Sequence, residues 1–406
     1  MDRVILHCDM NSFFASVELL SHPELKEVPV AVSGNPDNRH GIILAKNEPA
    51  KKAGVVTAET VWQALKKCPN LQFLRPHHAK YREYSRQINA IYYRFTDMVE
   101  PFSIDESWLD VTASQKLFGN GGQIADQIRE TVKKELGLTL SVGVSFNKIF
   151  AKMGSEYKKP DATTIITREN YKDLLWPLPI REMIFIGSAT AEKLHAFGIK
   201  TIGDLALSDK NWLENTFGKN GLAMYESANG LENSPVALAT EKQKIKSVGN
   251  GITFKRNLIG EDDIRTAVIS LADTVASRLR KYQLKAGGVK VDIKDPYFKT
   301  ISRQKQLDTR TNLAEEIASS VLDLLKRSWD LNSAIRLLTV TAINLSEEDE
   351  AEQLSIFQSD ENSRRSREKL GITMDNIRQK FGEKAILFGS VINNDIGIEL
   401  DETKEE

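Results

Sequence analysis

The segment 101–111, PFSIDESWLDV, constrains the fold most, because it sets two adjacent carboxylates, Asp105 and Glu106, among residues that favour strands. Successive side chains of a strand point to opposite faces, so these carboxylates can share a ligand only at a bend. A third carboxylate, Asp9, ends the run 4–9, VILHCD, which has the composition of a buried strand. Three carboxylates at strand ends suit Mg²⁺, and a pair of such ions can assist both oxygens of a phosphoryl transfer. Taken alone, an Asp-Glu pair in a turn is more often solvated than metal-bound.

The length and composition of the chain indicate several domains. Its 406 residues are 41% hydrophobic, which is enough to fill several cores, and the length suggests about two to four domains. No apolar run approaches the roughly 20 residues of a membrane span, and no leader precedes the first strand, so we expect a cytoplasmic protein that binds no membrane. The two cysteines, Cys8 and Cys68, predict neither a disulfide framework nor a cysteine metal site.

The charge of the chain is divided unevenly. Beyond residue 346 there are 16 acidic and 8 basic residues, a formal charge of −8, so the total of −1 leaves +7 for residues 1–346. A basic body favours phosphate binding, and an acidic tail suits a different partner. The same division also fits many proteins that bind no nucleic acid.

The hydrophobic pattern predicts a ferredoxin-like fold in the first part of the chain. The order is strand, helix, hairpin, helix and strand, at 4–9, 80–98, 101–111, 124–136 and 138–144. Shorter strands and helices are inserted after the first strand, at 28–78, and the composition becomes helical from residue 176. A second βαββαβ pattern without the acids follows a polar linker, at 247–255, 264–279, 289–294, 300–306, 312–329 and 337–343.

Two segments, HCDMNSFFASVE at 7–18 and SIDESWLDV at 103–111, resemble the signature of Y-family DNA polymerases, closest to the DinB or DNA polymerase IV branch. The similarity extends over nearly the whole chain. It implies an α+β multidomain right hand with a ferredoxin-like palm, small fingers, a helical thumb with a helix-hairpin-helix, and a βαββαβ little finger. The implied limits are 1–11 and 79–167 for the palm, 12–78 for the fingers, 168–235 for the thumb, 236–246 for a linker, 247–346 for the little finger and 347–406 for an acidic tail.

The resemblance also implies roles for single residues. In the family, two Mg²⁺ ions are held by the first acid, the later acid pair and the backbone carbonyl after the first acid, which are here Asp9, Asp105, Glu106 and Met10. An aromatic residue five positions beyond the first acid excludes ribonucleotides, and Phe14 stands there, although its spacing fits a second core phenylalanine equally well. The remaining nucleotide-binding positions are Phe13, Lys51, Ser103 and Lys159.

The chain departs from the family pattern near the expected triphosphate. Relatives usually carry a Tyr and an Arg where this chain has Glu48 and Lys51. Lysine offers a point charge without the arginine fork, and Glu48 should repel phosphate unless it pairs with a lysine. After the proline that follows Lys159, Asp161-Ala162 replaces the usual Asn-Gly, so we expect an altered loop there.

Two further segments resemble DNA-binding parts of the family. Residues 184–205 resemble a helix-hairpin-helix with turns at Gly187 and Gly198, which would offer backbone N–H groups to DNA phosphates. Phe185 replaces an earlier glycine of that motif, so a plain helical hairpin is an equal alternative. Lys246, Ser247 and Arg336 resemble the phosphate contacts of the little finger, which implies sequence-tolerant binding.

The acidic tail contains the segment 353–357, QLSIF, which resembles the peptide that docks bacterial polymerases in the groove of the sliding clamp. Its contacts would be Gln353, Leu354, Ile356 and Phe357, in a stretch too acidic and polar to fold alone. The alternative is a chance apolar patch. Residues 374–388 fit one more amphipathic helix, whose role the sequence does not disclose.

Our preferred hypothesis is a template-directed DNA polymerase of the translesion type, with low fidelity, that joins a dNTP to a primer 3′-hydroxyl. Its expected partners are primer-template DNA, dNTP and the bacterial sliding clamp, and we expect a monomer. One alternative is a catalytically silent, clamp-bound relative, which the three acids disfavour. The other is a nucleotide cyclase on the same palm topology, which would leave the helix-hairpin-helix and the clamp peptide without a purpose.

Overall fold

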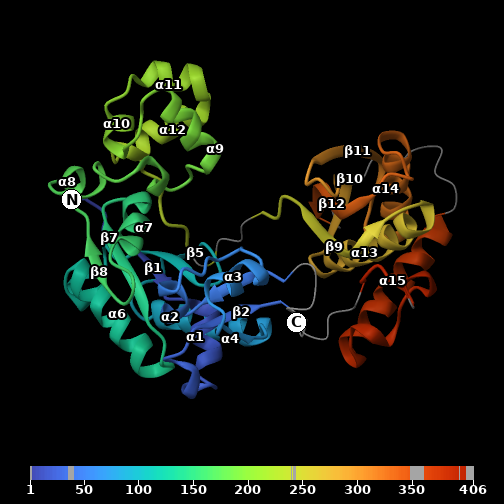
Figure 1. Ribbon diagram of the computed structural model, residues 1–406, viewed down its shortest axis with the longest axis horizontal. Helices are drawn as coiled ribbons and strands as arrows, with labels where there is room; N and C mark the ends of the chain where they lie inside the picture. The colour runs from blue at the N-terminus through green and yellow to red at the C-terminus, as the bar shows by residue number, and fades with distance from the viewer. Residues whose placement is uncertain are drawn as a thin grey trace. The chain divides into compact units, whose positions relative to one another are not determined.

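The computed structural model describes residues 2–34, 41–238, 240, 244–347, 361–392 and 394–398. Two compact units divide it: the first holds the described residues up to Thr240, and the second holds those from Lys244 onward (Figure 1). Among the described helices, none is long and apolar enough to cross a membrane.

A five-stranded sheet forms the centre of the first unit. Its order is β5-β6-β1-β7-β8, with β1 (Ile5–Met10), β5 (Val99–Pro101), β6 (Glu106–Asp110), β7 (Leu140–Ser145) and β8 (Thr163–Ile165). Leu6, Cys8 and Met10 alternate along β1 and join one core cluster with residues of helices α4 (His78–Tyr92) and α6 (Gly121–Leu136). His7 and Asp9 point to the opposite face. This order of elements confirms the predicted ferredoxin-like fold.

Helix α7 (Lys148–Tyr157) covers that opposite face at very short range. A Cβ on Gly143 of β7 would stand 1.8 Å from the carbonyl oxygen of Ala151, so only glycine permits this approach. The helix begins where the Asn147 side chain accepts the N–H of Phe150 at 2.7 Å. The close approach brings the polar side chains of α7 next to those of β1.

The segment inserted between β1 and α4 builds a three-stranded sheet of its own. Its order is β3-β2-β4, with β2 (Val30–Ser33), β3 (Ile43–Lys46) and β4 (Gln72–Leu74). Four short helices accompany it: α1 (Phe13–Leu19), η1 (Pro23–Leu25), α2 (Glu48–Lys52) and α3 (Val61–Lys67). The core of this insertion is small, with Ala31, Ile43 and Val61 among its buried members.

A helical region follows the five-stranded sheet. Its elements are α8 (Tyr171–Leu175), η2 (Ile180–Glu182), α9 (Ser188–Ala196), α10 (Ile202–Ala206), α11 (Lys210–Phe217) and α12 (Lys219–Ala228). One further short helix, α5 (Gln115–Phe118), lies earlier in the chain, directly before α6. The core of the helical region includes Leu194, Leu205 and Leu213 and continues into Phe150 of α7. Beyond α12, Val236 is 1% exposed and packs with Ile5 and Trp108 of the sheet. The first residue of the predicted linker is therefore anchored on the first unit.

The second unit is a four-stranded sheet with two long helices on one face (Figure 1). The strand order is β11-β10-β12-β9, with β9 (Val248–Leu258), β10 (Leu284–Lys294), β11 (Thr300–Thr311) and β12 (Ile335–Glu347). The helices are α13 (Glu261–Lys281) and α14 (Ala314–Ser328). This is the predicted second βαββαβ repeat.

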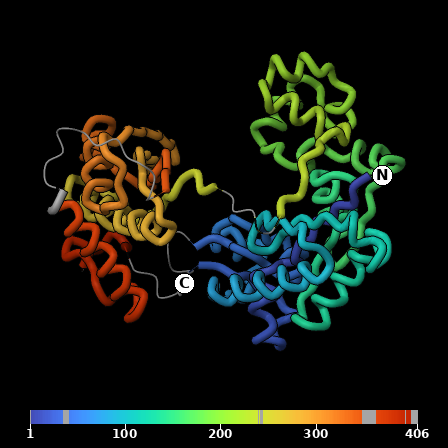
Figure 2. Tube along the Cα trace, turned by 180° about the vertical axis from the view of Figure 1, so that it is seen from behind, coloured from blue at the N-terminus to red at the C-terminus, as the bar shows by residue number. Residues whose placement is uncertain are grey.

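The C-terminal part of the chain packs onto the second unit, with α15 drawn in red in Figure 2. It forms α15 (Glu361–Phe381), η3 (Glu383–Ala385) and η4 (Gly389–Val391), so the last helix begins and ends earlier than the predicted 374–388. Arg378 pairs with Asp273 of α13 at 2.7 Å, and the arginine is only 7% exposed. Ile396 is buried in the shared core, and its carbonyl accepts the N–H of Lys255 on β9 at 2.9 Å.

Candidate active site

Two carboxylates, those of Asp9 and Glu106, meet where β1 and β6 run side by side, and Asp105 directly precedes Glu106. The antiparallel register pairs Asp9 with Glu106, and the N–H of Met10 donates to the carbonyl of Asp105 at 3.1 Å. Asp9 is 4% exposed, whereas Asp105 and Glu106 are half-buried. The hydroxyl of Ser103 donates to Oδ1 of Asp105 at 2.7 Å. The structure therefore brings the predicted acids Asp9 and Glu106 together. Asp105 lies at the adjoining bend, and among the described residues the group with ligand atoms within 4.8 Å of one another holds Asp9, Glu106 and His7 and not Asp105.

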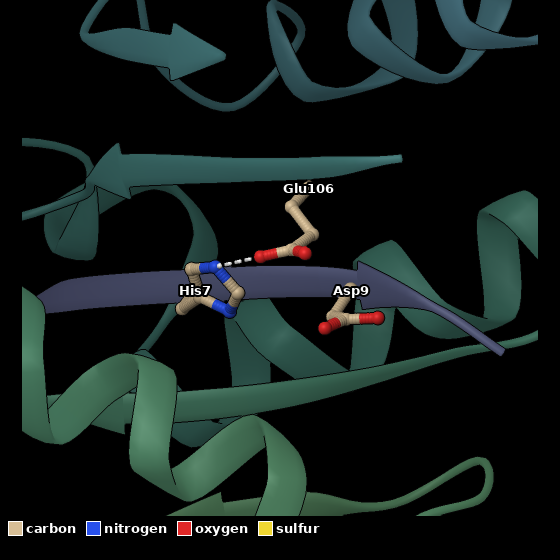
Figure 3. A group of neighbouring side chains, drawn as sticks. All are labelled: His7, Asp9 and Glu106. Carbon is tan, nitrogen blue, oxygen red and sulfur yellow. Dashed lines mark ion pairs between the residues drawn. The ribbon is translucent and has the colours of Figure 1, made fainter. Parts of the chain in front are cut away.

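A buried histidine joins this group and was not predicted. His7 lies two residues before Asp9 on the same face of β1, as Figure 3 shows with Glu106 beside it. Its Nε2 stands 3.2 Å from Oε2 of Glu106, and its Nδ1 bonds the Ser155 hydroxyl of α7 at 2.8 Å. Potential ligand atoms of His7, Asp9 and Glu106 lie within 4.8 Å of one another. The period of two in a strand was the signal in the sequence that placed His7 beside Asp9.

Two lysines reach into the group of carboxylates. Nζ of Lys159 lies 2.9 Å from Oδ2 of Asp9 and 2.7 Å from Oε1 of Glu156. Lys152 of α7 forms an ion pair with Glu106. Of the two lysines only Lys159 was predicted, because the position of α7, which carries Lys152, over β1 is a tertiary feature.

Burial and these neighbours move the acid pKa values apart. Burial raises the pKa of Asp9 to about 7 against the opposing charge of Lys159, and burial also raises the pKa of Asp105. Burial acts to raise the pKa of Glu106 as well, but the neighbouring His7 and the ion pair with Lys152 outweigh it and lower that pKa to about 2. The pKa of His7 falls to about 4 because burial disfavours its charged form, so the imidazole is neutral at pH 7.

The chemistry of these groups fits a hard divalent cation. Asp9, Asp105 and Glu106 supply carboxylate oxygens, and the carbonyl of Met10 lies on the same strand end. Magnesium prefers oxygen ligands and keeps several waters, which a half-buried bend allows. The two nearby lysines offset part of the negative charge, as a cation would.

An aromatic stack follows the first acid along the chain. Phe13 is buried in the core at 3% exposed, while Phe14 is half-buried. The ring of Phe14 stacks on that of Tyr81 at a centroid distance of 4.1 Å and an interplanar angle of 9°. The Tyr81 hydroxyl donates to the buried carboxylate of Glu18 at 2.5 Å. Glu18 therefore fixes the Tyr81 ring, and the Tyr81 ring supports one face of Phe14. The helical periodicity of the sequence did not predict this contact.

Comparison with known proteins identifies the family. The impB/mucB/samB family model matches residues 8–156, its C-terminal domain matches residues 245–356, and the IMS family HHH motif matches residues 168–199. The chain is 44% identical to a DNA polymerase IV of Acetivibrio thermocellus, over 97% of this chain and 98% of that protein. It is 38% identical to a DNA polymerase IV of Clostridium kluyveri, over 97% of this chain and 99% of that protein. The chain belongs to the Y-family of DNA polymerases, in its DinB branch.

A solved Y-family structure shows the same architecture. The Y-family DNA polymerase chimera Dbh-Dpo4(243-245)-Dbh matches with a TM-score of 0.74 and 25% sequence identity, over 85% of this chain and 99% of that chain. The predicted right hand, with a ferredoxin-like palm, small fingers, a helical thumb and a βαββαβ little finger, is confirmed. Y-family membership also implies use of a divalent metal.

In the fingers of this Y-family chain, the two departures from the family pattern face each other. Nζ of Lys51 lies 3.6 Å from Oε1 of Glu48, one turn apart on α2. Both side chains are exposed, at 55% and 40%, so the pair is weak. Glu48 therefore has a lysine neighbour, and Lys51 stays a predicted nucleotide contact.

In the thumb, the helix-hairpin-helix turns lie where the sequence predicts them. Gly187 caps the N-terminus of α9, and Gly198 follows that helix with a φ of 83°, a value that favours glycine. Phe185 has a φ of 68° and is 70% exposed, so it adopts a left-handed conformation that glycine takes more easily. The motif is thus formed despite the substitution.

The remaining predicted sites lie on the second unit or outside the described residues. Lys246 and Ser247 precede β9, and Arg336 lies on β12 with its guanidinium 4.7 Å from the centre of the Phe298 ring. No DNA contact of these residues is tested by the structure, so they stay predictions. The clamp peptide residues Gln353, Leu354, Ile356 and Phe357 lie outside the described residues.

Proposed function

We propose that this Y-family chain uses Asp9, Asp105 and Glu106 for nucleotidyl transfer during DNA synthesis. The chain is a DNA-directed DNA polymerase of the translesion type, which binds primer-template DNA and dNTP and acts in DNA repair. The observation that supports this role is the pairing of Asp9 with Glu106, next to the bend at Asp105, in a chain that aligns over 97% of its length with a DNA polymerase IV.

We propose two Mg²⁺ ions as the cofactor, held by the three carboxylates and the carbonyl of Met10. When bound, such ions supply positive charge to the attacking and the leaving oxygens of the transfer. Glu106 is ionised at neutral pH because His7 and Lys152 beside it lower its pKa, so it is ready to bind a cation. The Ser103 hydroxyl holds the Asp105 carboxylate from the other side.

The nucleotide is proposed to lie between the palm and the fingers. Lys159 is a point charge beside Asp9 and suits the triphosphate, with Lys51 as a second contact from the fingers. Phe14 is proposed to exclude the ribose 2′-hydroxyl, since its ring is held in place by Tyr81. Phe13 is buried and supports Phe14 from the core.

The proposed domain limits are those given by the sequence: palm 1–11 and 79–167, fingers 12–78, thumb 168–235, linker 236–246, little finger 247–346 and tail 347–406. Small fingers leave the nascent base pair poorly enclosed, which fits low fidelity and tolerance of damaged templates. The thumb turns and the little-finger residues Lys246, Ser247 and Arg336 are proposed phosphate contacts that carry no sequence information.

The tail is proposed to dock the polymerase on the bacterial sliding clamp through 353–357, with the chain as a monomer in the cytoplasm. The support is the apolar QLSIF segment within an acidic stretch.

The test is incorporation of single nucleotides on primed templates that differ in one templating base, with Mg²⁺. We expect the complementary dNTP to be preferred on each template. If the folded protein binds DNA and adds no nucleotide with Mg²⁺ or Mn²⁺, the catalytically silent, clamp-bound relative is the better hypothesis. Glu48→Tyr is then the first substitution with which to try to restore activity. Conversion of a nucleotide without primer would favour the cyclase.

A further inference from the structure

The loop that carries Lys159 contains an unusual anchor at Asp161. This loop joins α7 to β8, and Asp161 has a φ of 50°, in the left-handed region that Asp and Asn tolerate better than other non-glycine residues. The carboxylate of Asp161 is the group that distinguishes this loop from the Asn-Gly of the family pattern. Asp161 lies two residues beyond Lys159, so whatever fixes it also fixes the base of the lysine side chain.

The guanidinium of Arg129 on α6 binds both the backbone carbonyl and the side-chain carboxylate of Asp161. Nη2 donates to the Asp161 carbonyl at 2.5 Å and to its Oδ1 at 2.7 Å. Lys133, one turn further along α6, lies 3.3 Å from the other carboxylate oxygen. Burial acts to raise the pKa of Asp161, but the hydrogen bonds from Arg129 and Lys133 outweigh it and lower that pKa, so the side chain is charged at neutral pH.

The same arginine also ties down the strand that follows the loop. Its Nη1 donates to Oδ1 of Asp126 at 3.1 Å and to the Thr163 hydroxyl at 3.4 Å. The guanidinium is largely buried, with the side chain 17% exposed, and its planar fork serves several acceptors at once. A lysine at this position would reach fewer of them.

The other side of the loop is tied to the metal-binding strand. With its amide oxygen turned toward the neighbouring donors, Asn11 accepts the N–H of Asp161 at 2.9 Å. Asn11 lies two residues beyond Asp9, the carboxylate that Lys159 contacts. The carbonyl of Ala162 accepts the N–H of Val142 on β7 at 2.9 Å. The loop is thus held between α6, β7 and the end of β1.

We propose that Arg129 and Asp161 are positioning residues for Lys159, which hold its loop so that the ammonium meets the triphosphate of the incoming nucleotide. The proposal rests on the proposed triphosphate contact of Lys159. Lysine has a long, flexible stem, so its ammonium occupies one place only when its backbone is fixed and counter-ions guide it. Loss of the anchor leaves the charge present and misplaces it, which affects nucleotide binding more than the chemical step.

The first experiment measures incorporation of one dNTP at saturating primer-template DNA. We expect Arg129→Met to raise the KM for dNTP about five- to tenfold, with kcat and the Kd for DNA within about twofold. Asp161→Asn should change KM less than about twofold, because asparagine keeps the left-handed conformation and an acceptor oxygen. The matched control is Arg94→Met, which removes a bidentate pair between Arg94 and Glu135 of the same helix α6 at 2.6 and 2.8 Å. This control should leave KM unchanged.

The second experiment is a double-mutant cycle with Lys159→Met. If Arg129 acts through Lys159, Arg129→Met adds no further increase of KM in the Lys159→Met background. An equal increase in both backgrounds would overturn the proposal, since Arg129 would then act independently. If Lys159→Met by itself leaves KM unchanged, the triphosphate role of Lys159 is wrong and the proposal falls with it. Should Arg129→Met fail to fold, Arg129→Lys replaces it in the cycle, with a smaller expected increase of about threefold.

Discussion

The hydroxyl of Tyr81 allows a sharp prediction about the support of Phe14. Tyr81→Phe deletes one oxygen and keeps the ring on which Phe14 stacks. That hydroxyl donates to Glu18 at 2.5 Å, and the two residues are 0% and 3% exposed. A hydrogen bond to a charged group contributes about 1.5–3 kcal/mol, and His77 remains as a partner of Glu18 at 3.1 Å. We expect the free energy of unfolding of the first unit to fall by about 2 kcal/mol.

Urea denaturation measures this loss, with Tyr92→Phe as the matched control. Tyr92 lies on the same helix and is 1% exposed, but its hydroxyl contacts the sulfur of Met10 at 4.0 Å, which is a weak acceptor. The control should lose less than about 1 kcal/mol. Equal losses for the two variants would refute the argument that Glu18 depends on Tyr81. Ribonucleotide discrimination should stay the same in Tyr81→Phe, because the ring beneath Phe14 is retained.

Three further predictions address the gate, the tail and the last helix. Phe14→Ala should raise ribonucleotide incorporation, measured as the ratio of kcat/KM for rNTP and dNTP. An unchanged ratio would show that Phe14 is a core residue and does not exclude ribonucleotides. Phe357→Ala should weaken binding to the sliding clamp and leave clamp-free synthesis unchanged, whereas equal loss of both would indicate misfolding. Arg378→Ala leaves the partly buried Asp273 without its 2.7 Å partner, so the free energy of unfolding of the second unit should fall by about 3 kcal/mol in thermal denaturation. An unchanged melting midpoint would show that α15 does not stabilise that unit.

The fold was predictable because its signals are local. The alternation of apolar residues along β1 and the helical periodicity of α4 and α6 repeat within a few residues, and they fix the order of the palm elements. The bend at Asp105 was predicted because neighbouring carboxylates on a straight strand would point to opposite faces. The second βαββαβ repeat was found in the same way.

Several parts of the site were not predictable because their partners are distant in the sequence. Glu18 and Tyr81 are separated by 63 positions and Arg129 and Asp161 by 32, so periodicity within an element does not reveal the pairs. His7 was visible as a neighbour of Asp9 on one face of a strand, yet its ligand-like position depends on Glu106 across the sheet. Such contacts depend on how whole elements pack together, and the local pattern of residues in one sequence does not show that packing.

The central claim is that Asp9, Asp105 and Glu106 carry the nucleotidyl transfer, and primer extension by the Asp105→Ala, Glu106→Ala double variant tests it most directly. Metal ions held by these carboxylates would supply several kcal/mol of transition-state stabilisation, so we expect the rate with Mg²⁺ to fall by roughly a thousandfold. DNA binding and the melting temperature, measured beside it, should stay close to those of the unchanged protein. Extension by the folded double variant at the rate of the unchanged protein would contradict the account.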